Sequence, residues 1–139
     1  MCGLAGFLLP PGERTDAPAW LGAMAKRIAH RGPDAQGVWW DPGHGVGLAH
    51  RRLSIIDLSP AGAQPMASHC GRWVLAFNGE IYNHRALRRQ LESAGPIAWR
   101  GHSDTEVLLE GIAHDGLDAT LERADGMFAL AAYDRQARV

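Results

Sequence analysis

The feature that most constrains the fold is a buried strand near each end of the chain, with helical segments between them. Residues 3–9 (GLAGFLL) and 127–133 (MFALAAY) are short apolar runs, and Pro10-Pro11-Gly12 ends the first. The second run is apolar on both faces, which is typical of a strand with neighbours on either side. Strands at both ends with helices between them predict a layered α+β domain.

Three helices are predicted between these strands. The first begins at Asp16 and stops near Gly32, and the second begins at Asn83. The third opens with Ser103-x-x-Glu106, which matches a capping box. Short strands are predicted where Gly, Pro and Asp separate apolar stretches, at residues 37–40, 46–50 and 73–77.

Composition narrows the functional classes. The 139 residues suit one modest domain, and a net charge of −1 gives no electrostatic case for nucleic acid or a membrane surface. No apolar stretch approaches the 18 residues that a membrane span needs, and no basic segment of a signal peptide precedes Cys2, so we expect a cytoplasmic protein. No Cys-x-x-Cys or His-x-x-x-His spacing occurs, so no metal site is expected.

Cys2 is the strongest candidate for catalysis. Because a small residue follows Met1, we expect the methionine to be removed, which leaves a thiol and a free α-amine on one Cα. A thiol of pKa about 8.5 beside an amine of pKa roughly 7.7–8.0 is a nucleophile with its own general base. The alternative is a cysteine that stands at position two by chance, in a frayed and inert terminus.

Three further motifs each have two interpretations. Asn78-Gly79 could supply the donors of an oxyanion hole, or form a two-residue hairpin turn. The guanidinium of Arg52 could bind a carboxylate, or belong to a surface arginine. Asp104 could bind an ammonium group, or simply favour the start of a helix. Segments 30–34 and 64–66 are interpreted as rigid loops that shape walls.

Taken in order, these motifs resemble the class II glutamine amidotransferase domain, and within it the glutaminase half of glutamine-hydrolysing asparagine synthetases and their relatives. The resemblance extends from Cys2 to about Tyr133. Its motifs are Met-Cys-Gly-Leu-Ala-Gly (1–6), His-Arg-Gly-Pro-Asp (30–34), His-Arg-Arg-Leu-Ser-Ile-Ile-Asp (50–57), Gln-Pro-Met (64–66), Phe-Asn-Gly-Glu-Ile-Tyr-Asn (77–83), Ser-Asp-Thr-Glu (103–106) and Asp-Gly-Met-Phe-Ala (125–129).

The resemblance implies a four-layer αββα sandwich of the N-terminal-nucleophile hydrolase type. It implies that Cys2 attacks L-glutamine, forms a γ-glutamyl thioester and releases ammonia, while Asn78 and the backbone of Gly79 form the oxyanion hole. The glutamine-binding residues that it implies are Arg52 for the α-carboxylate, the backbone of Leu53, Ser54, Ile55 and Ile56 along the pocket, Glu80 and Asp104 at the α-amino end, and Asn78 and Gly79 at the amide.

The family pattern also extends beyond this chain. The domain would cover residues 2–139 and lack its C-terminal part, because the family domain continues past Val139 with another strand. An ATP-dependent synthetase domain that receives the ammonia normally follows, and it is absent here. The glutaminase step needs no cofactor, whereas ATP and Mg²⁺ are expected only for that absent domain. The sequence leaves open whether aspartate or another molecule accepts the ammonia.

Two expectations concern the isolated chain. The alternative to a glutaminase is a truncated, non-catalytic remnant that binds glutamine or a partner without turnover. In addition, an open edge on the apolar strand 127–133 favours dimerisation or aggregation. We therefore expect the chain to self-associate, for example as a homodimer.

Overall fold

The computed structural model describes residues 2–10 and 16–139. The expected loss of Met1 and the strand stop at Pro11-Gly12 lie outside these residues. The elements are, in chain order, β1 (Gly3–Leu8), α1 (Ala17–Arg27), η1 (Ala29–Arg31), β2 (Ala35–Asp41), β3 (Val46–Arg52), η2 (Pro60–Gly62), β4 (Met66–Ala67), β5 (Trp73–Ile81), α2 (His84–Ala94), α3 (Asp104–Asp115), α4 (Leu117–Arg123) and β6 (Gly126–Asp134).

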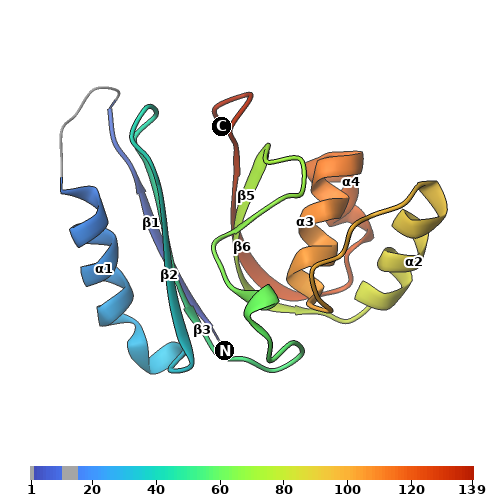
Figure 1. Cartoon of the computed structure of the whole chain (residues 1–139), viewed down its shortest axis with the longest axis horizontal. Coiled ribbons are helices and arrows are strands. Elements are labelled where there is room, and N and C mark those ends of the chain that lie inside the picture. The colour runs from blue at the N-terminus through green and yellow to red at the C-terminus, as the bar shows by residue number, and fades with distance from the viewer. Residues whose placement is uncertain (1, 11–15) are drawn as a thin grey trace.

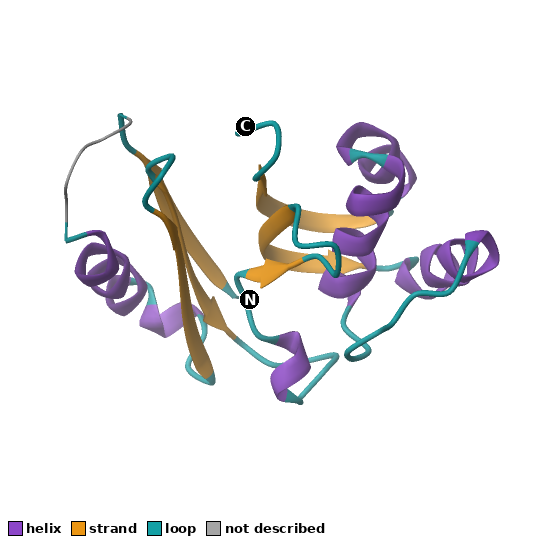
Figure 2. Cartoon of the chain, turned by 45° about the horizontal axis from the view of Figure 1, so that its top comes forward, coloured by secondary structure: helices purple, strands orange, loops and turns teal. Residues whose placement is uncertain are grey.

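The elements form four layers (Figure 1). One antiparallel sheet has the strand order β1-β3-β2, and the other has the order β4-β5-β6. Helix α1 covers the outer face of the first sheet, and α2, α3 and α4 lie outside the second, as the rotated view in Figure 2 also shows. The predicted α+β class and the αββα sandwich are confirmed.

The side chains of each strand point alternately to its two faces, and this produces three separate hydrophobic clusters. Because successive strand side chains point to opposite faces, Leu75 and Phe77 of β5 pack against the helices, while Val74 and Ala76 face the other sheet. Leu48 of β3 completes the small core between the sheets. A third cluster under α1 contains Leu21, Ala25 and Ala49.

Several local predictions need correction. The strands at both ends form, but neither is buried throughout, because Leu8 of β1 is 76% exposed and Met127 of β6 is 67% exposed. Helix α1 ends at Arg27, and a separate 3₁₀ turn carries the chain to Arg31, so the predicted helix was too long. Asp16 stands at the N-cap of α1, but its side chain makes no capping hydrogen bond. Helix α4 and the two-residue strand β4 were not predicted.

The predicted capping box is only half formed. Ser103 Oγ accepts a hydrogen bond from the Glu106 N–H at 3.2 Å, as expected. The Glu106 carboxylate does not return to the helix start, because it accepts the backbone N–H groups of Arg100 and Gly101 at 2.8 and 3.0 Å. The side chain therefore anchors the segment that leads into α3.

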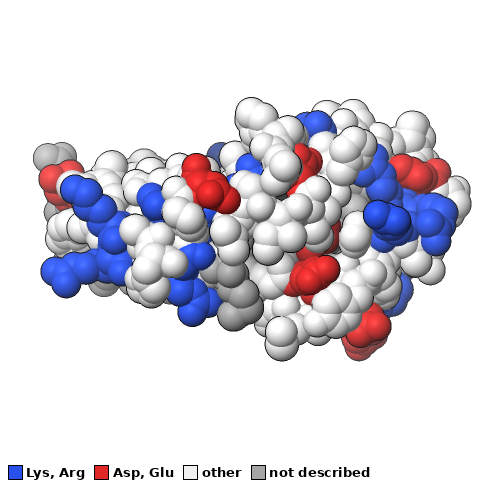
Figure 3. Space-filling view, turned by 90° about the horizontal axis from the view of Figure 1, so that it is seen from below, with Lys and Arg blue, Asp and Glu red and all other residues white. Residues whose placement is uncertain are grey.

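Three further features bear on the chain as a whole. Strand β6 pairs only with β5 among the described residues, so it lies at a sheet edge, as the sequence analysis expects. Among the described helices, none has both the length and the apolar character needed to cross a membrane. Basic and acidic side chains are interspersed on the face shown in Figure 3, in keeping with the small net charge.

Candidate active site

A cavity of about 230 Å³ opens where the first residues of the chain meet the second sheet. The structure brings all of the predicted site residues to its wall, although they come from four separate segments. They are Cys2, Arg52, Leu53, Ser54, Ile55, Ile56, Asn78, Gly79, Glu80 and Asp104. The arrangement shows where these residues lie, and their roles in binding and catalysis stay predictions.

Cys2 is held on the cavity wall by the start of β1. Since Gly3 pairs with Arg51 in the β1–β3 ladder, Cys2 lies beside the end of β3. The Leu53 N–H donates a hydrogen bond to Cys2 Sγ at 3.3 Å, and the Leu53 carbonyl lies 3.6 Å from the same sulfur. The thiol is free and half-buried, so it is fixed in place and still open to the cavity.

The outer edge of β5 runs along the cavity and presents a row of backbone N–H groups. In an antiparallel pair these groups alternate in direction, so residues 77, 79 and 81 all point away from β6. The Phe77 N–H donates to Gln64 Oε1 at 2.6 Å, and the Ile81 N–H donates to Asp104 Oδ2 at 3.0 Å. Between them, the Gly79 N–H has no hydrogen-bond acceptor among the described residues, so it is available to a ligand in the cavity.

The hairpin-turn interpretation of Asn78-Gly79 is wrong. Both residues lie inside β5, where Asn78 pairs with Ala129 and Gly79 pairs with Phe128 of β6. Glycine is required because a Cβ atom at position 79 would lie 2.4 Å from Phe128 Cβ and from the Met127 carbonyl oxygen. Close approach of β6, and not a turn, explains this glycine.

Asn78 points toward the sheet that carries Cys2. It belongs to the set of alternate β5 residues that face the first sheet, together with Val74 and Ala76. Its Oδ1 atom is buried and has no hydrogen-bond partner among the described residues. Buried polar groups normally have a hydrogen-bond partner, so this free oxygen indicates that the carboxamide faces a ligand site.

The two neighbouring arginines face opposite ways. Arg52 is only 9% exposed, which rules out a surface arginine, and its guanidinium donates hydrogen bonds to the Ser59 and Asp57 carbonyl oxygens. Arg51 donates instead to the Gly32 carbonyl at 2.8 Å, away from the cavity. Because a guanidinium carries five N–H groups, Arg52 keeps donors free for a carboxylate in the cavity.

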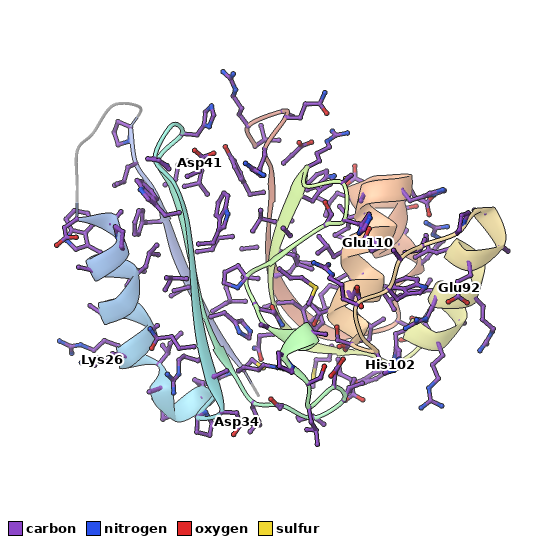
Figure 4. The ribbon with its side chains drawn as sticks, in the orientation of Figure 1. Lys26, Asp34, Asp41, Glu92, His102 and Glu110 are labelled. Atoms are coloured by element: carbon purple, nitrogen blue, oxygen red, sulfur yellow. The ribbon has the colours of Figure 1, made fainter. Side chains whose placement is uncertain are left out.

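The loop that follows Arg52 is anchored from both halves of the fold. Asp34 Oδ2 accepts the Ser54 N–H at 2.7 Å, and Asp57 Oδ2 accepts the His102 N–H at 2.9 Å. Asp34 and His102 lie on opposite sides of the molecule's lower end in Figure 4. The hydrogen bonds from His102 and Ser59 lower the pKa of Asp57 to about 2. The charged carboxylate therefore fixes the loop that forms one wall of the cavity.

The carboxylates predicted for the ammonium end differ in burial. Asp104 is 5% exposed as the first residue of α3, and its oxygens accept the Ile81 and Thr105 N–H groups at 3.0 and 2.9 Å. It thus occupies a helix start and also lines the cavity. Glu80 is exposed at the cavity mouth, and its side chain forms no hydrogen bond with another described residue.

Sequence reasoning gave Gln64 only a role as a loop former. Its side chain accepts the Phe77 N–H through Oε1 and donates to Thr105 Oγ1 at 3.3 Å through Nε2, so it joins β5 to α3 behind the cavity. The Gln-Pro-Met motif marked the segment, but no spacing pointed to partners 13 and 41 residues away.

The layers and the site define a class before any relative is considered. Two antiparallel sheets stacked between helices, with a cysteine at the second residue on the wall of a cavity between them, are the arrangement of an N-terminal-nucleophile hydrolase. In the solved structures, a likeness is found to the glutamine phosphoribosylpyrophosphate (PRPP) amidotransferase of Bacillus subtilis in complex with ADP and GMP. The TM-score is 0.55 at 26% identity, over 66% of this chain and 22% of that one.

The sequence comparisons identify the family. The model of the glutamine amidotransferase domain matches residues 1–139, and the chain therefore belongs to that family. It is 38% identical to asparagine synthetase [glutamine-hydrolyzing] 1 of Bacillus subtilis, with 100% of this chain and 22% of the relative covered. For asparagine synthetase B of Escherichia coli the identity is 42% over 81% of this chain and 19% of the relative. For amidase chry2 of Gibberella zeae it is 39% over 96% and 21%.

The similarity covers most or all of this chain but only part of each relative. The chain spans about a fifth of the length of the curated relatives that it matches. About four fifths of the length of each of these relatives lies outside the segment that it shares with this chain.

Proposed function

We propose that this chain binds L-glutamine in the cavity and hydrolyses it to glutamate and ammonia. The α-amine of Cys2 takes the thiol proton, and the sulfur attacks the γ-carboxamide carbon. Asn78 and the Gly79 N–H stabilise the oxyanion of the tetrahedral intermediate. Its collapse breaks the C–N bond, and the leaving nitrogen takes the proton from the amine to depart as ammonia. Water then cleaves the γ-glutamyl thioester, which yields glutamate and restores the thiol.

The observation that carries this proposal is the meeting of complementary groups in one cavity. The thiol of Cys2, the free backbone N–H and the carboxamide of residues 78–79 and the guanidinium of Arg52 lie together with the carboxylates of Glu80 and Asp104. Asp57, the third carboxylate of the lining, accepts the His102 and Ser59 N–H groups and holds the loop. A free amino acid needs such opposite charges for its two ends, because a guanidinium matches a carboxylate and a carboxylate matches an ammonium. The proposed roles are Arg52 at the α-carboxylate and Glu80 with Asp104 at the α-amine.

We propose further that residues 2–139 work as the glutaminase part of a larger assembly. Relatives that match the whole chain are named as glutamine-hydrolysing asparagine synthetases, which supports an ATP-dependent, amide-forming domain or subunit as the recipient of the ammonia. The acceptor molecule is set by that recipient. The cavity residues determine only the nitrogen donor.

The test compares the two cysteines of the chain. Cys2→Ala and Cys2→Ser are expected to abolish release of glutamate and ammonia while glutamine binding, measured by calorimetry, persists. Cys70→Ala is the matched control, because Cys70 is exposed, does not line the cavity, and places its thiol 3.3 Å from Ser68 Oγ. Turnover by Cys2→Ala would contradict the proposal. Binding without turnover in the unmodified chain would favour the non-catalytic remnant.

A further inference from the structure

His50 is a buried histidine that the proposed reaction does not use. It lies on β3, two residues before Arg52, and its side chain is 0% exposed. Its Nε2 atom lies 2.9 Å from the Phe77 carbonyl oxygen. A carbonyl oxygen only accepts hydrogen bonds, so Nε2 carries the proton. Burial lowers the pKa of His50, which favours the neutral ring with a bare Nδ1.

This hydrogen bond lies between the two sheets of the fold. It joins a strand of the first sheet, β3, to a strand of the second sheet, β5. The first sheet carries Cys2, and the second carries Asn78 and Gly79. The bond from His50 to Phe77 therefore connects the nucleophile's sheet to the residue immediately before the proposed oxyanion hole.

Side chains satisfy both polar groups of the Phe77 backbone. Strand β4 pairs with β5 only as far as Leu75, so the outer edge of β5 has no partner strand at Phe77. Gln64 Oε1 accepts the Phe77 N–H at 2.6 Å, and His50 Nε2 donates to its carbonyl. Two side chains thus replace the missing strand at the last outward-facing position before Gly79.

We infer that His50 is a positioning residue for the oxyanion hole. By fixing the Phe77 carbonyl against β3, it sets the direction of the Gly79 N–H and of the Asn78 side chain relative to Cys2. It touches neither the substrate nor the reacting atoms. This inference rests on the proposed glutaminase function. A misplacement of about 1 Å in such a site costs on the order of 100-fold in rate, so the loss of this single bond has a measurable effect.

The kinetic test uses two substitutions at one position. His50→Leu keeps the bulk and removes the donor, whereas the side-chain amide of His50→Gln reaches about as far as Nε2. We expect His50→Leu to lower kcat about 10- to 100-fold, with KM for glutamine changed less than about threefold, and His50→Gln to recover most of kcat. Leu48→Ala is the matched control, since Leu48 faces the same inter-sheet layer and only packs there. It should lower the melting temperature and leave kcat within about threefold of the unmodified chain.

A second readout does not need turnover. In ¹H–¹⁵N NMR spectra of the 139-residue chain, the Gly79 amide resonance is expected to shift in His50→Leu and to keep its position in His50→Gln and Leu48→Ala. The inference is overturned if His50→Leu keeps kcat, or if the Gly79 resonance does not respond to loss of the donor. If the unmodified chain hydrolyses no glutamine, the proposed function fails, and the Gly79 resonance alone decides for or against the positioning role.

Discussion

Replacing Asn78 by alanine should separate activity from stability. The side chain lines the cavity, and its Oδ1 atom is buried without a hydrogen-bond partner among the described residues. The backbone of Asn78 pairs with Ala129 in the β5–β6 ladder, and alanine preserves that pairing. The substitution therefore removes an oxygen that has no partner in the folded protein, together with the side-chain N–H group that the proposed transition state uses as a donor.

The expected changes in kcat and in the free energy of unfolding can be estimated separately. Loss of one oxyanion donor lowers kcat by about 10²–10³, which corresponds to about 2.7–4 kcal/mol of barrier. An unsatisfied buried acceptor costs about 1–3 kcal/mol, so its removal offsets the small loss of packing beside an open cavity. We expect Asn78→Ala to have a free energy of unfolding within about 1 kcal/mol of the unmodified chain, or above it.

Asn83→Ala provides the matched control. Its side chain donates to the Arg123 carbonyl at 2.8 Å and accepts the Asp125 N–H at 3.0 Å, and it does not line the cavity. With two hydrogen bonds lost, this variant should lose about 1–2 kcal/mol of stability and keep its kcat. Urea unfolding and steady-state glutaminase kinetics measure both effects. If Asn78→Ala changes only KM, or is destabilised more than Asn83→Ala, the oxyanion argument is wrong.

Three further outcomes are expected. Gly79→Ala should destabilise the fold by about 1–3 kcal/mol in urea unfolding, because its Cβ would overlap the backbone of β6, and an unchanged midpoint would refute that packing. Arg52→Ala and Asp104→Ala should mainly raise KM for glutamine, since both hold ends of the substrate that do not react, and a loss in kcat alone would argue against these roles. The hydrogen bonds from Arg72 lower the pKa of Asp134 to about 2, below its unfolded value of 3.8. Its stabilising contribution is therefore present above about pH 4 and lost as the pH falls toward 2. Melting temperatures should drop over that interval, and less steeply in Asp134→Asn.

Local patterns predicted much of the fold. The strands near both ends, the helix after Asn83 and the helix behind Ser103 all form where apolar periodicity and capping residues indicate. Helix α4 was missed because its seven residues carry only a short pattern after the glycine that ends α3. Its position depends on packing against α3, including the contact of Thr120 with Gly111, which no local propensity encodes.

The site depended on information beyond local pattern. Asn78-Gly79 favours a hairpin turn when considered alone, and only its pairing with β6 keeps it inside a strand. The order of the family motifs overcame that ambiguity and identified the residues that line the cavity. Gln64 and His50 could not be assigned in this way, because each acts through a hydrogen bond to Phe77 from a distant part of the chain.

The central claim, that Cys2 is the nucleophile in a glutamine site, is tested most directly by covalent labelling. The chain is treated with a diazoketone that mimics glutamine, and the modified peptide is located by mass mapping. We expect one label, on the sulfur of Cys2 in chains that have lost Met1, and we expect excess glutamine to protect against it. A label on Cys70, or an active preparation in which Cys2 stays unlabelled, would contradict the account.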